Sequence, residues 1–292
     1  MRSGLFIPGD SEKKLTKGIS CGADSLFVDL EDSVSLDHKQ AARQVASGFL
    51  SELNQQADRP GLFVRVNAFD TELTDDDLAA VMKARPDGIV LPKCEHGQDV
   101  TRLDAILRVH EVENEIEDGA TKIIAIITET AIGALNAGTY RRSSKRLQAV
   151  AWGAEDLSAD IGSARRREDG SYRDVFRYAR VQTLLGAIAA GVEPVDTVYT
   201  DFRDDEGLAR ECREGKLDGF TAKMAIHPAQ VPVINEIYTP DADEIARAQK
   251  IVDAFEAAGN PGVLGVEGEM LDRPHLRKAQ KLLTRFMQLN LK

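Results

Sequence analysis

The sequence has few of the residues that build disulfide frameworks, zinc sites or membrane spans. Its three cysteines, Cys21, Cys94 and Cys212, are widely spaced and form no CxxC pair, which is typical of reduced thiols in a cytoplasmic protein. The five histidines show neither HxH nor HExxH spacing, so zinc is not expected. No uninterrupted apolar run reaches the roughly 18 residues that a membrane helix needs. These absences leave a soluble intracellular protein as the expectation.

Positive charge is also scarce. The formal net charge is −11 and the isoelectric point is near 5.1, whereas nonspecific binding to nucleic acid or to an anionic membrane needs clustered positive charge. We therefore expect neither partner. The basic cluster Arg165 to Arg167 is short, and we interpret it as a solvated loop. The N-terminus reaches Pro8 and Gly9 before any apolar stretch long enough for a signal peptide, so the cytoplasm is the predicted location.

Eight short apolar runs recur at a regular interval along the chain. They are SGLFIPG, DSLFVDLED, GLFVRVNA, GIVLPKC, KIIAIITET, QAVAWGAED, VDTVYTD and GFTAKMAIHP. Their apolar character is continuous, which is typical of parallel strands covered on both faces. Eight strand-helix alternations in about 230 residues predict a (β/α)8 barrel of the TIM type. An open doubly wound sheet is the weaker alternative, because no GxGxxG follows the first run.

The segments between these runs have helical periodicity. In VFRYARVQTLLGAIAAG we predict that six apolar side chains share the buried face: Val175, Phe176, Ala179, Leu184, Leu185 and Ile188. After His227 the pattern changes to two helical segments joined by the glycine-rich loop NPGVLGVEGEML. We therefore predict a barrel domain over residues 1–235 and a helical segment over residues 236–292 that acts as a lid or an oligomerisation segment.

The residues that close the apolar runs are unusually polar. Active sites of (β/α)8 barrels lie at the carboxyl ends of the strands, so these side chains are predicted to meet there. In chain order they are Asp29, Glu31, Asp32, Arg65, Asn67, Lys93, Glu95, Glu129, Glu155, Asp156, Lys223 and His227. Acids outnumber bases in this set, which indicates a site for a cation.

Glu129 and Asp156 are the predicted metal ligands. A carboxylate at the end of a buried strand is costly unless it finds a cation or hydrogen-bond donors. Two carboxylates on neighbouring strands suit Mg²⁺, which takes oxygen ligands at about 2.1 Å and is usually bound by one or two carboxylates together with waters and substrate oxygens. The alternative is that such acids cap the following helices. It stays open for Asp156 and also for Glu31 and Asp32.

Arg65 and Lys93 are the basic residues among these strand ends. Arg65 lies between valines in VRVN, and a guanidinium that points into a barrel needs acids or a substrate carboxylate as partners. Lys93 allows two interpretations, the Schiff-base lysine of an aldolase or a structural lysine that is ion-paired near Glu95. The acids on the next two runs favour the metal route over the Schiff base.

Eight stretches resemble, in order, the HpcH/HpaI aldolase and citrate lyase superfamily. They are RSGLFIPG, FVDLEDSV with KQAAR, VRVN, GIVLPKCE, ITETAIG, WGAEDLSADIG, KMAIHPAQ and GEMLD. Over residues 2–272 the sequence is most similar to the citrate lyase beta-subunit branch, with its malyl-CoA and citramalyl-CoA lyase relatives. The resemblance implies a magnesium-dependent barrel, with Mn²⁺ as a possible substitute. Such an enzyme makes or breaks a carbon-carbon bond between an acyl thioester and a keto acid.

The resemblance also implies roles for individual residues. The metal ligands of the family fall on Glu129 and Asp156, and its active-site arginine falls on Arg65. Its acid/base aspartate falls on Asp272, which by itself resembles a helix N-cap. In the family this aspartate is delivered by a lid that often comes from an adjacent subunit, which implies a homotrimer or homohexamer.

Further residues are expected to contact the substrate. The backbone amides of Gly153 and Ala154, beside Glu155, are predicted to hold the carboxylate of the keto acid at a helix start. Arg2 and Lys17 are candidates for the phosphates of acyl-CoA. Five other residues are expected to support the site: Asp29, Glu31, Asp32, Lys93 and Glu95.

Two departures from the family pattern leave the substrate open. Ala222 precedes Lys223 where the family usually has glycine, and the loop ARRREDGSYRD follows the sixth run. The favoured substrate is a hydroxyacyl-CoA such as malyl-CoA or citramalyl-CoA, which gives an acyl-CoA and glyoxylate or pyruvate. One alternative is a citrate lyase beta subunit that acts on an acyl-carrier thioester, and another is a class II aldolase that acts on a free hydroxy-keto acid. A binding module without chemistry is disfavoured by the joint presence of the metal pair, Arg65 and Asp272.

Overall fold

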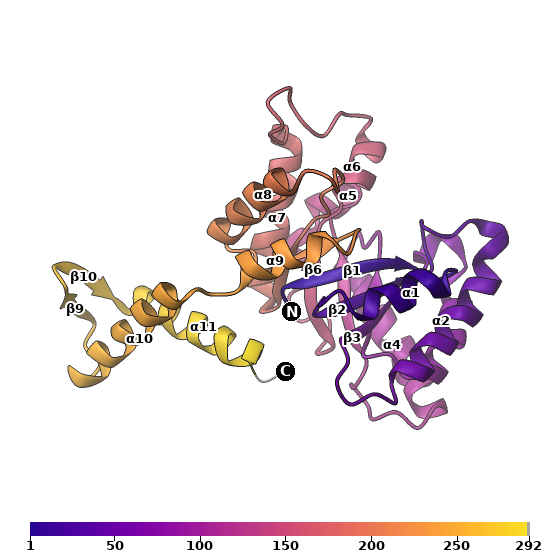
Figure 1. Cartoon of the computed structure of the whole chain (residues 1–292), viewed down its shortest axis with the longest axis horizontal. Helices are drawn as coiled ribbons and strands as arrows, with labels where there is room; N and C mark the ends of the chain where they lie inside the picture. Colours follow the sequence, from indigo (N-terminus) through magenta and orange to yellow (C-terminus); the bar gives the residue numbers. More distant parts are fainter. Residues whose placement is uncertain (291–292) are drawn as a thin grey trace. The chain divides into compact units, whose positions relative to one another are not determined.

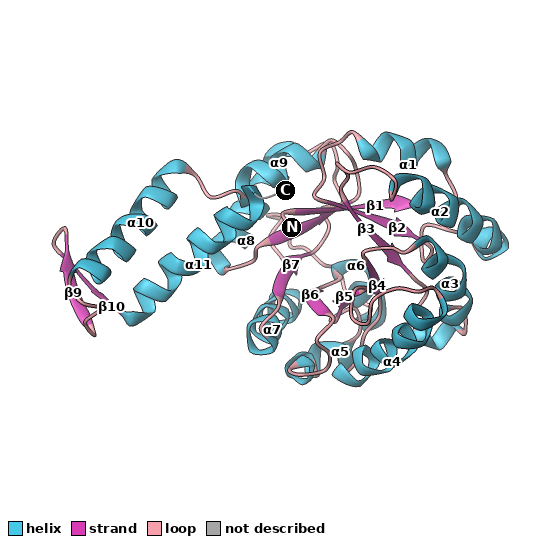
Figure 2. Cartoon of the chain, turned by 90° about the horizontal axis from the view of Figure 1, so that it is seen from below, coloured by secondary structure: helices cyan, strands magenta, loops and turns pink. Residues whose placement is uncertain are grey.

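The computed structural model describes residues 1–290 and divides the chain into two compact units, which meet in sequence between Asn235 and Glu236. The first unit contains a closed barrel of eight parallel strands, arranged in chain order (Figures 1 and 2). The strands are β1 (Ser3–Pro8), β2 (Ser25–Asp29), β3 (Gly61–Arg65), β4 (Gly88–Leu91), β5 (Lys122–Ile126), β6 (Leu147–Ala151), β7 (Glu193–Asp196) and β8 (Ala222–Ala225). The predicted (β/α)8 barrel is confirmed, and a helical extension follows it.

Helices cover the outside of the barrel, as Figure 2 shows. They are α1 (Glu12–Ile19), α2 (Lys39–Leu53), α3 (Thr74–Val81), α4 (Gly97–Glu113), α5 (Ala131–Leu135), α6 (Ala154–Ile161), α7 (Asp174–Ala190), α8 (Asp205–Asp218) and α9 (Gln230–Tyr238). Each strand is therefore buried between the barrel interior and a helical layer, which explains the continuous apolar runs. Within residues 1–290, no helix combines the length and the apolar character needed to cross a membrane.

Alternate side chains of each strand point into the barrel. The interior core is formed by Phe27, Phe63, Val90, Ile124, Ile126, Ala149, Ala151, Val195, Ala222 and Met224. Two glycines make room for its large rings. A Cβ at Gly4 would lie 2.3 Å from the ring of Phe27, and a Cβ at Gly88 would lie 2.4 Å from the ring of Phe63. The barrel interior is thus a packed core.

Helix α7 differs from its predicted packing. Phe176 and Ala179 are buried as expected, but Val175, Leu185 and Ile188 are 44%, 58% and 56% exposed. The prediction was wrong for these three because the helix is apolar around most of its circumference, so periodicity alone does not choose the inward face. The outward side chains form a stripe together with exposed residues of α5, which contacts α7. The members of this apolar stripe are Val175, Tyr178, Val181, Leu185, Ile188, Ile132 and Leu135.

The second unit is a helix, a hairpin and a helix. Helix α10 (Ala242–Ala257) is followed by strands β9 (Val263–Val266) and β10 (Glu269–Asp272) and by α11 (Arg273–Asn290). The glycine-rich stretch is therefore a β-hairpin and not the loop that we predicted. Its turn residues Glu267 and Gly268 both have positive φ, as a tight two-residue hairpin turn requires. The unit has its own small core, which includes Val252, Phe255 and Leu271.

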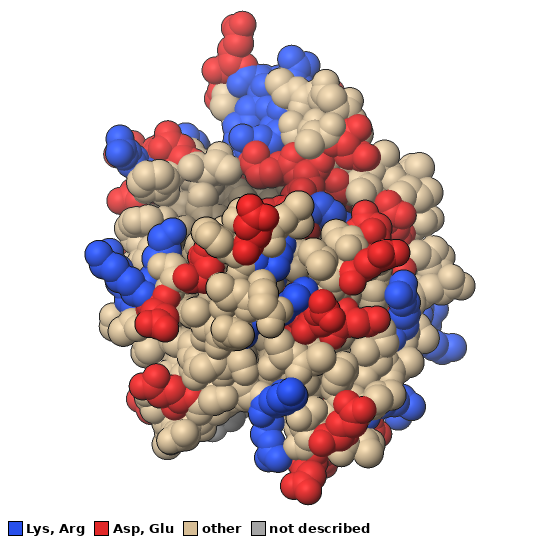
Figure 3. Space-filling model, turned by 90° about the vertical axis from the view of Figure 1, so that its right-hand side faces the viewer, with Lys and Arg blue, Asp and Glu red and all other residues tan. Residues whose placement is uncertain are grey.

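The charged surface is mixed. Acidic and basic side chains are interspersed over the face in Figure 3. Arg165, Arg166 and Arg167 form ion pairs with Glu155, Glu211 and Asp174, respectively, and Arg167 and Asp174 are exposed. Arg166 also lies over the rings of Tyr172 and Tyr199. The positive charges of this loop are therefore paired with acids and aromatic rings of the same chain.

A buried polar network joins β6, β7 and β8 to the outer helices. Asp196 is fully buried and accepts hydrogen bonds from Trp152 Nε1 at 2.7 Å and from the Arg180 guanidinium at 3.0 and 3.2 Å. Lys223 is also fully buried and donates to Glu211 of α8 at 2.7 Å. Lys223 therefore points out of the barrel, away from the interior, and the prediction that it belongs to the strand-end site is wrong.

Replacing Asp196 by Asn is expected to destabilise the barrel. Burial alone would raise the pKa of Asp196, but Lys223 and Arg180 hold that pKa below its usual value. The pairing therefore stabilises the fold above the unfolded-state pKa and is lost as the pH falls through the lower folded-state pKa. For Asp196→Asn we expect a loss of about 3 kcal/mol at pH 7. Urea unfolding measures it, and the difference from wild type should shrink below about pH 4.

Asp58→Asn is the control, because Asp58 lies exposed in the loop before β3. A pH-independent effect of Asp196→Asn would contradict the assignment of its stability contribution to the ion pairs.

Candidate functional site

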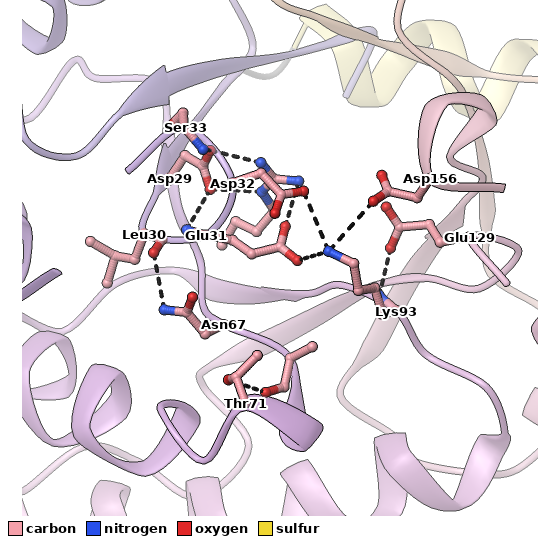
Figure 4. Close-up of polar contacts among 12 residues, drawn as sticks. Asp29, Leu30, Glu31, Asp32, Ser33, Asn67, Thr71, Lys93, Glu129 and Asp156 are labelled. Atoms are coloured by element: carbon pink, nitrogen blue, oxygen red, sulfur yellow. Dashed lines mark hydrogen bonds and ion pairs between the residues drawn. The ribbon is translucent and has the colours of Figure 1, made fainter. Parts of the chain in front are cut away.

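Strand alternation places the polar strand ends inside the barrel mouth. Phe27 and Phe63 point inward, so Asp29 and Arg65, two residues later on the same strands, point inward as well. The parallel register sets these two residues side by side. All strands run in one direction, so the carboxyl ends of β2 to β6 meet at the same edge. The sequence therefore brings acids and bases from separate segments into one cluster, shown in Figure 4.

Arg65 is held by two carboxylates. Its Nε and Nη2 donate to the two oxygens of Asp29, both at 2.7 Å, and its Nη1 lies 2.8 Å from Glu31 Oε2. The guanidinium also lies over the ring of Phe6, 4.6 Å from the centroid. Burial alone would lower the pKa of Arg65, but Asp29 and Glu31 raise it. Arg65 is therefore a fixed positive charge, as predicted from its position between two valines.

Lys93 links the acids of β2 to those of β6. Its ammonium pairs with Glu31, lies 3.3 Å from Asp32 and lies 3.5 Å from Asp156. Lys93 is therefore ion-paired, as one of its two interpretations required, but its partners are these three acids, and the expected partner Glu95 is exposed. Lys93 itself has φ of +49°, an uncommon conformation for a residue with a side chain. This conformation lets its backbone N–H donate to Glu129 Oε2 at 2.5 Å.

Glu129 is almost completely buried, with 2% of its surface exposed. Burial raises its pKa well above the usual value, and the charges of Asp156 and Glu31 raise it further. Gly153 makes room for this side chain, because a Cβ there would lie 2.6 Å from Glu129 Cγ. Gly153 thus has a structural role beside its predicted role as a substrate-binding amide, because Glu129 requires a residue without a side chain at this position.

Glu155 and Asp156 lie in the first turn of α6, whose N-cap is Gly153. Both acids are therefore also placed where the helix dipole favours negative charge, as the capping alternative required. The carboxylates of Asp156 and Glu129 lie side by side in Figure 4. The amide of Ala154, predicted to hold a substrate carboxylate, donates instead to Thr197 Oγ1 at 3.3 Å.

These residues line a cavity of about 300 Å³. Its polar wall includes Asp29, Asp32, Arg65, Glu129, Glu155 and Asp156, and its apolar wall includes Phe6, Ile126, Val198, Met224 and Ile226. Thr197, at the end of β7, also lines it. Sequence reasoning missed Phe6, Met224 and Thr197, although strand alternation was a usable signal for the first two. The cavity combines one fixed cation with several acids, an arrangement suited to a small carboxylic acid and a metal ion.

The donor set fits a divalent cation. Arg65 pairs with Asp29 and Glu31, and the Lys93 ammonium pairs with Glu31 and lies 3.5 Å from Asp156, whereas Glu129 accepts a hydrogen bond from the Lys93 backbone N–H. Burial, and after it the charges of Asp156 and Glu31, raise the pKa of Glu129, and a bound cation would favour its charged form. Within residues 1–290, no three acidic, histidine or cysteine side chains converge as a metal-binding group. The protein thus offers one or two carboxylates, as magnesium sites that also use water and substrate oxygens do.

The structure places several other predicted residues away from the cavity. Arg2 precedes β1, at the amino end of the strands, and donates hydrogen bonds to Asp24 at 2.6 to 3.1 Å. Lys17 is in the last turn of α1, which also lies toward the amino ends because α1 connects β1 to a parallel strand. Both were expected at the mouth, and both expectations were wrong because they rested on charge without topology. His227 stacks on Phe202, with ring centroids 5.1 Å apart.

Asp272 belongs to the second unit. It is the last residue of β10, and its Oδ1 lies 2.6 Å from Nδ1 of His275. Its side chain is 46% exposed. Asp272 therefore belongs to a different compact unit from the cavity residues. Its role as the acid/base of the site stays a prediction.

Comparisons with known proteins identify the family of the chain. A family model described as HpcH/HpaI aldolase/citrate lyase matches residues 2–228. The citrate lyase subunit beta of Leuconostoc mesenteroides subsp. cremoris is 35% identical over 284 residues, which cover 97% of this chain and 92% of that protein. The mitochondrial citramalyl-CoA lyase of Rattus norvegicus is 32% identical over 295 residues, which cover 97% of this chain and 85% of that protein.

A solved structure is similar over nearly the whole chain. It is the crystal structure of protein CitE from Mycobacterium tuberculosis in complex with magnesium, acetoacetate and coenzyme A, with a TM-score of 0.77 and 32% sequence identity. The match covers 98% of this chain and 99% of that one. The chain therefore belongs to the HpcH/HpaI aldolase/citrate lyase family and is a carbon-carbon lyase.

Proposed function

We propose that this protein is a magnesium-dependent lyase that cleaves a hydroxyacyl-CoA, such as citramalyl-CoA or malyl-CoA. The products are an acyl-CoA and a keto acid, pyruvate or glyoxylate. The observation that carries the proposal is the placement of Arg65 and the acids Glu129 and Asp156 around one cavity. A relative named citramalyl-CoA lyase and a similar structure that contains magnesium and coenzyme A support this substrate class.

Glu129 and Asp156 would hold Mg²⁺, or Mn²⁺ in its place. The bound ion supplies a Lewis acid and a template for the oxygens of the acid half of the substrate. The chain prepares this position in two ways: the Lys93 amide fixes one oxygen of Glu129, and Gly153 leaves space for the carboxylate. Lys93 lies close to Asp156 and so offsets part of its charge.

Arg65 would stabilise negative charge on the substrate. Its guanidinium lines the cavity and is fixed by Asp29 and Glu31. A donor that is already oriented costs little reorganisation when charge develops on a nearby oxygen. Arg65 is therefore suited to hold a carboxylate or an enolate oxygen of the reacting molecule.

Asp272 is the proposed acid/base. In the hairpin register it lies opposite Val263, and Met270 lies opposite Gly265, so these side chains share the outer face of the hairpin. Val263 and Met270 are 55% and 79% exposed. Apolar side chains around a carboxylate suit docking on the rim of a cavity. In cleavage Asp272 would protonate the carbon of the acyl-CoA enolate, and in condensation it would remove a proton from that carbon.

We also propose that the protein is a homotrimer or homohexamer, in which the lid of one copy serves the barrel of another. The apolar stripe on α5 and α7 supports self-association. Its seven side chains are 44% to 70% exposed, and a standard interface buries roughly 800 Å² on each partner. A soluble monomer rarely leaves so large an apolar patch uncovered, and a second copy is the occupant we infer.

A second candidate is a citrate lyase beta subunit that acts on an acyl-carrier thioester. The 35% identity to such a subunit favours it. Binding and turnover with an acyl carrier protein but not with CoA thioesters would decide for this candidate. A class II aldolase acting on a free hydroxy-keto acid would show turnover with neither thioester.

The substrate assignment is tested by incubating the protein and Mg²⁺ with citramalyl-, malyl- and methylmalyl-CoA. We expect equal amounts of keto acid and acyl-CoA from at least one of them, because the cavity holds both the predicted metal pair and Arg65. Keto acid, acyl-CoA and free CoA are measured separately, so hydrolysis is distinguished from cleavage. No turnover of any CoA thioester would contradict the proposed substrate class.

Removing either metal ligand should abolish activity without unfolding the barrel. For Glu129→Gln and Asp156→Asn we expect at least a 100-fold loss of kcat, because each variant keeps the shape and loses the anionic ligand. Mn²⁺ binding, followed by electron paramagnetic resonance, should weaken in parallel. Glu95→Gln is the matched control, since Glu95 is an exposed acid on a neighbouring loop. Wild-type Mn²⁺ affinity in Glu129→Gln would remove Glu129 from the metal site.

The adjacent-subunit lid predicts complementation between inactive variants. Asp272→Ala protein mixed with Glu129→Ala protein should regain activity under subunit exchange, because some barrels then have intact metal ligands and an intact Asp272 from a neighbour. Mixing Asp272→Ala with Asp272→Asn is the control and should recover none. Exchange is monitored with fluorescently labelled copies. Confirmed exchange without recovery would show that Asp272 does not act in a neighbour's site.

A further inference from the structure

Several buried polar residues lie behind the site and have no part in the chemistry proposed above. Lys39 and Arg43 belong to the sequence KQAAR at the start of α2. Asp77 comes from α3, and Asn67 follows β3. All four are buried, and Asp77 is completely so. Burial of this many polar groups is costly unless each finds its partners.

Lys39 fixes the loop that carries the acids of β2. Its ammonium donates three hydrogen bonds of 2.7 Å, to the carbonyl oxygens of Leu30 and Glu31 and to Asn67 Oδ1. Three donors on one nitrogen are thus all used. Two of the three acceptors are main-chain atoms at the point where the chain turns away from β2. The contact therefore constrains the path of the backbone.

A second set of hydrogen bonds, made by Asn67, Asp77 and Arg43, holds the groups that contact Lys39. Asn67 Nδ2 donates to the Leu30 carbonyl at 3.0 Å and to Asp77 Oδ2 at 2.7 Å, and the Asn67 backbone N–H donates to the same Asp77 oxygen at 2.7 Å. Arg43 Nε donates to the other oxygen of Asp77 at 2.8 Å. Hydrogen bonds thus connect Arg43 to Asp77, Asp77 to Asn67, and Asn67 to Lys39. The amide orientation of Asn67 follows from these partners.

The positive charge of Lys39 also has an electrostatic role, because several carboxylates lie near it. Burial lowers the pKa of Lys39, and the carboxylates of Asp77, Asp29 and Glu31 oppose that effect. A neutral donor of the same length would satisfy fewer of the three acceptors and would leave these acids less compensated. The clamp formed by Lys39, Asn67, Asp77 and Arg43 thus balances charge as well as holding the loop.

The clamped loop determines where the cations of the cavity lie. Glu31 contacts both Arg65 and Lys93, and the backbone carbonyl of Glu31 is one of the acceptors of Lys39. Asp29 binds the amides of Glu31 and Ser33 at 2.9 and 3.2 Å and also binds Arg65. A shift of the Leu30 and Glu31 carbonyls would therefore move the partners of Arg65 and Lys93 together.

We propose that Lys39 is a positioning residue, which acts through Glu31 to place Arg65 and Lys93 at the cavity. The effect on turnover rests on the lyase function proposed above. The effect on the loop does not, because it follows from the three hydrogen bonds alone. Displacements of about 1 Å in a catalytic group can cost about 100-fold in rate. Loss of the clamp is thus expected to lower turnover although Lys39 itself lies outside the cavity wall.

The test uses Lys39→Met, which keeps the aliphatic stem and removes the three donors. Lys13→Met is the matched control, because Lys13 is exposed on α1. Hydrogen-deuterium exchange of the full-length protein should be at least 10-fold faster over residues 28–36 in Lys39→Met, with β5 and β6 unchanged. Exchange that is unchanged over residues 28–36, or faster throughout the barrel, would overturn the proposal.

Turnover provides the second readout, through a double-mutant cycle with Glu31→Gln. We expect Lys39→Met to lower kcat at least 10-fold in the wild-type background and by less than 3-fold in the Glu31→Gln background, because residues that act through each other are not additive. Equal losses in both backgrounds would show that Lys39 does not act through Glu31. If the wild-type protein cleaves no CoA thioester, the proposed function fails, and the exchange measurement still decides whether Lys39 holds the loop.

Discussion

The carboxylate of Glu31 binds two cations at once, Arg65 on the next strand and Lys93 on the one after it. This double pairing joins β2, β3 and β4 at the mouth of the barrel, and the other features of the site depend on it. It fixes the guanidinium that faces the cavity, and it orients Lys93, whose main chain holds Glu129. Replacing a whole buried ion pair by apolar side chains is often neutral for stability, so the specific contribution of this cluster is the geometry that it imposes.

The cluster is supported from outside the barrel at two places. Behind β2 and β3, the clamp of Lys39, Asn67, Asp77 and Arg43 holds the backbone of the acidic loop. Behind β6 to β8, Asp196 joins Trp152 to Arg180 of α7. Functional groups on rigid strands, supported by a second layer of hydrogen bonds, keep their positions better than groups on free loops. The cavity therefore lies between two buried polar networks, and its acids are left in excess for a cation to balance.

Family membership and local geometry contribute different parts of the functional argument. The comparisons establish a carbon-carbon lyase of the HpcH/HpaI aldolase/citrate lyase family. The cavity is small, and ion pairs fix the Arg65 side chain in its polar wall. Such a wall suits the acid half of a substrate. The hairpin of the second unit adds an exposed aspartate among apolar side chains. The proposed substrates citramalyl-CoA and malyl-CoA differ in the keto acid that they would release, pyruvate or glyoxylate, so this wall is the part of the site that would distinguish them.

The barrel followed from the sequence because eight apolar runs and their spacing are local features, and strand ends in a parallel barrel must meet. Arg65, Glu129 and Asp156 were identified on that basis. Periodicity could not choose the inward face of α7, because that helix is apolar on both sides. Charge alone placed Arg2 and Lys17 at the mouth, whereas strand direction puts them at the opposite end. The partners of Lys93 and the clamp on Leu30 and Glu31 join residues far apart in the chain, so only tertiary packing decided them.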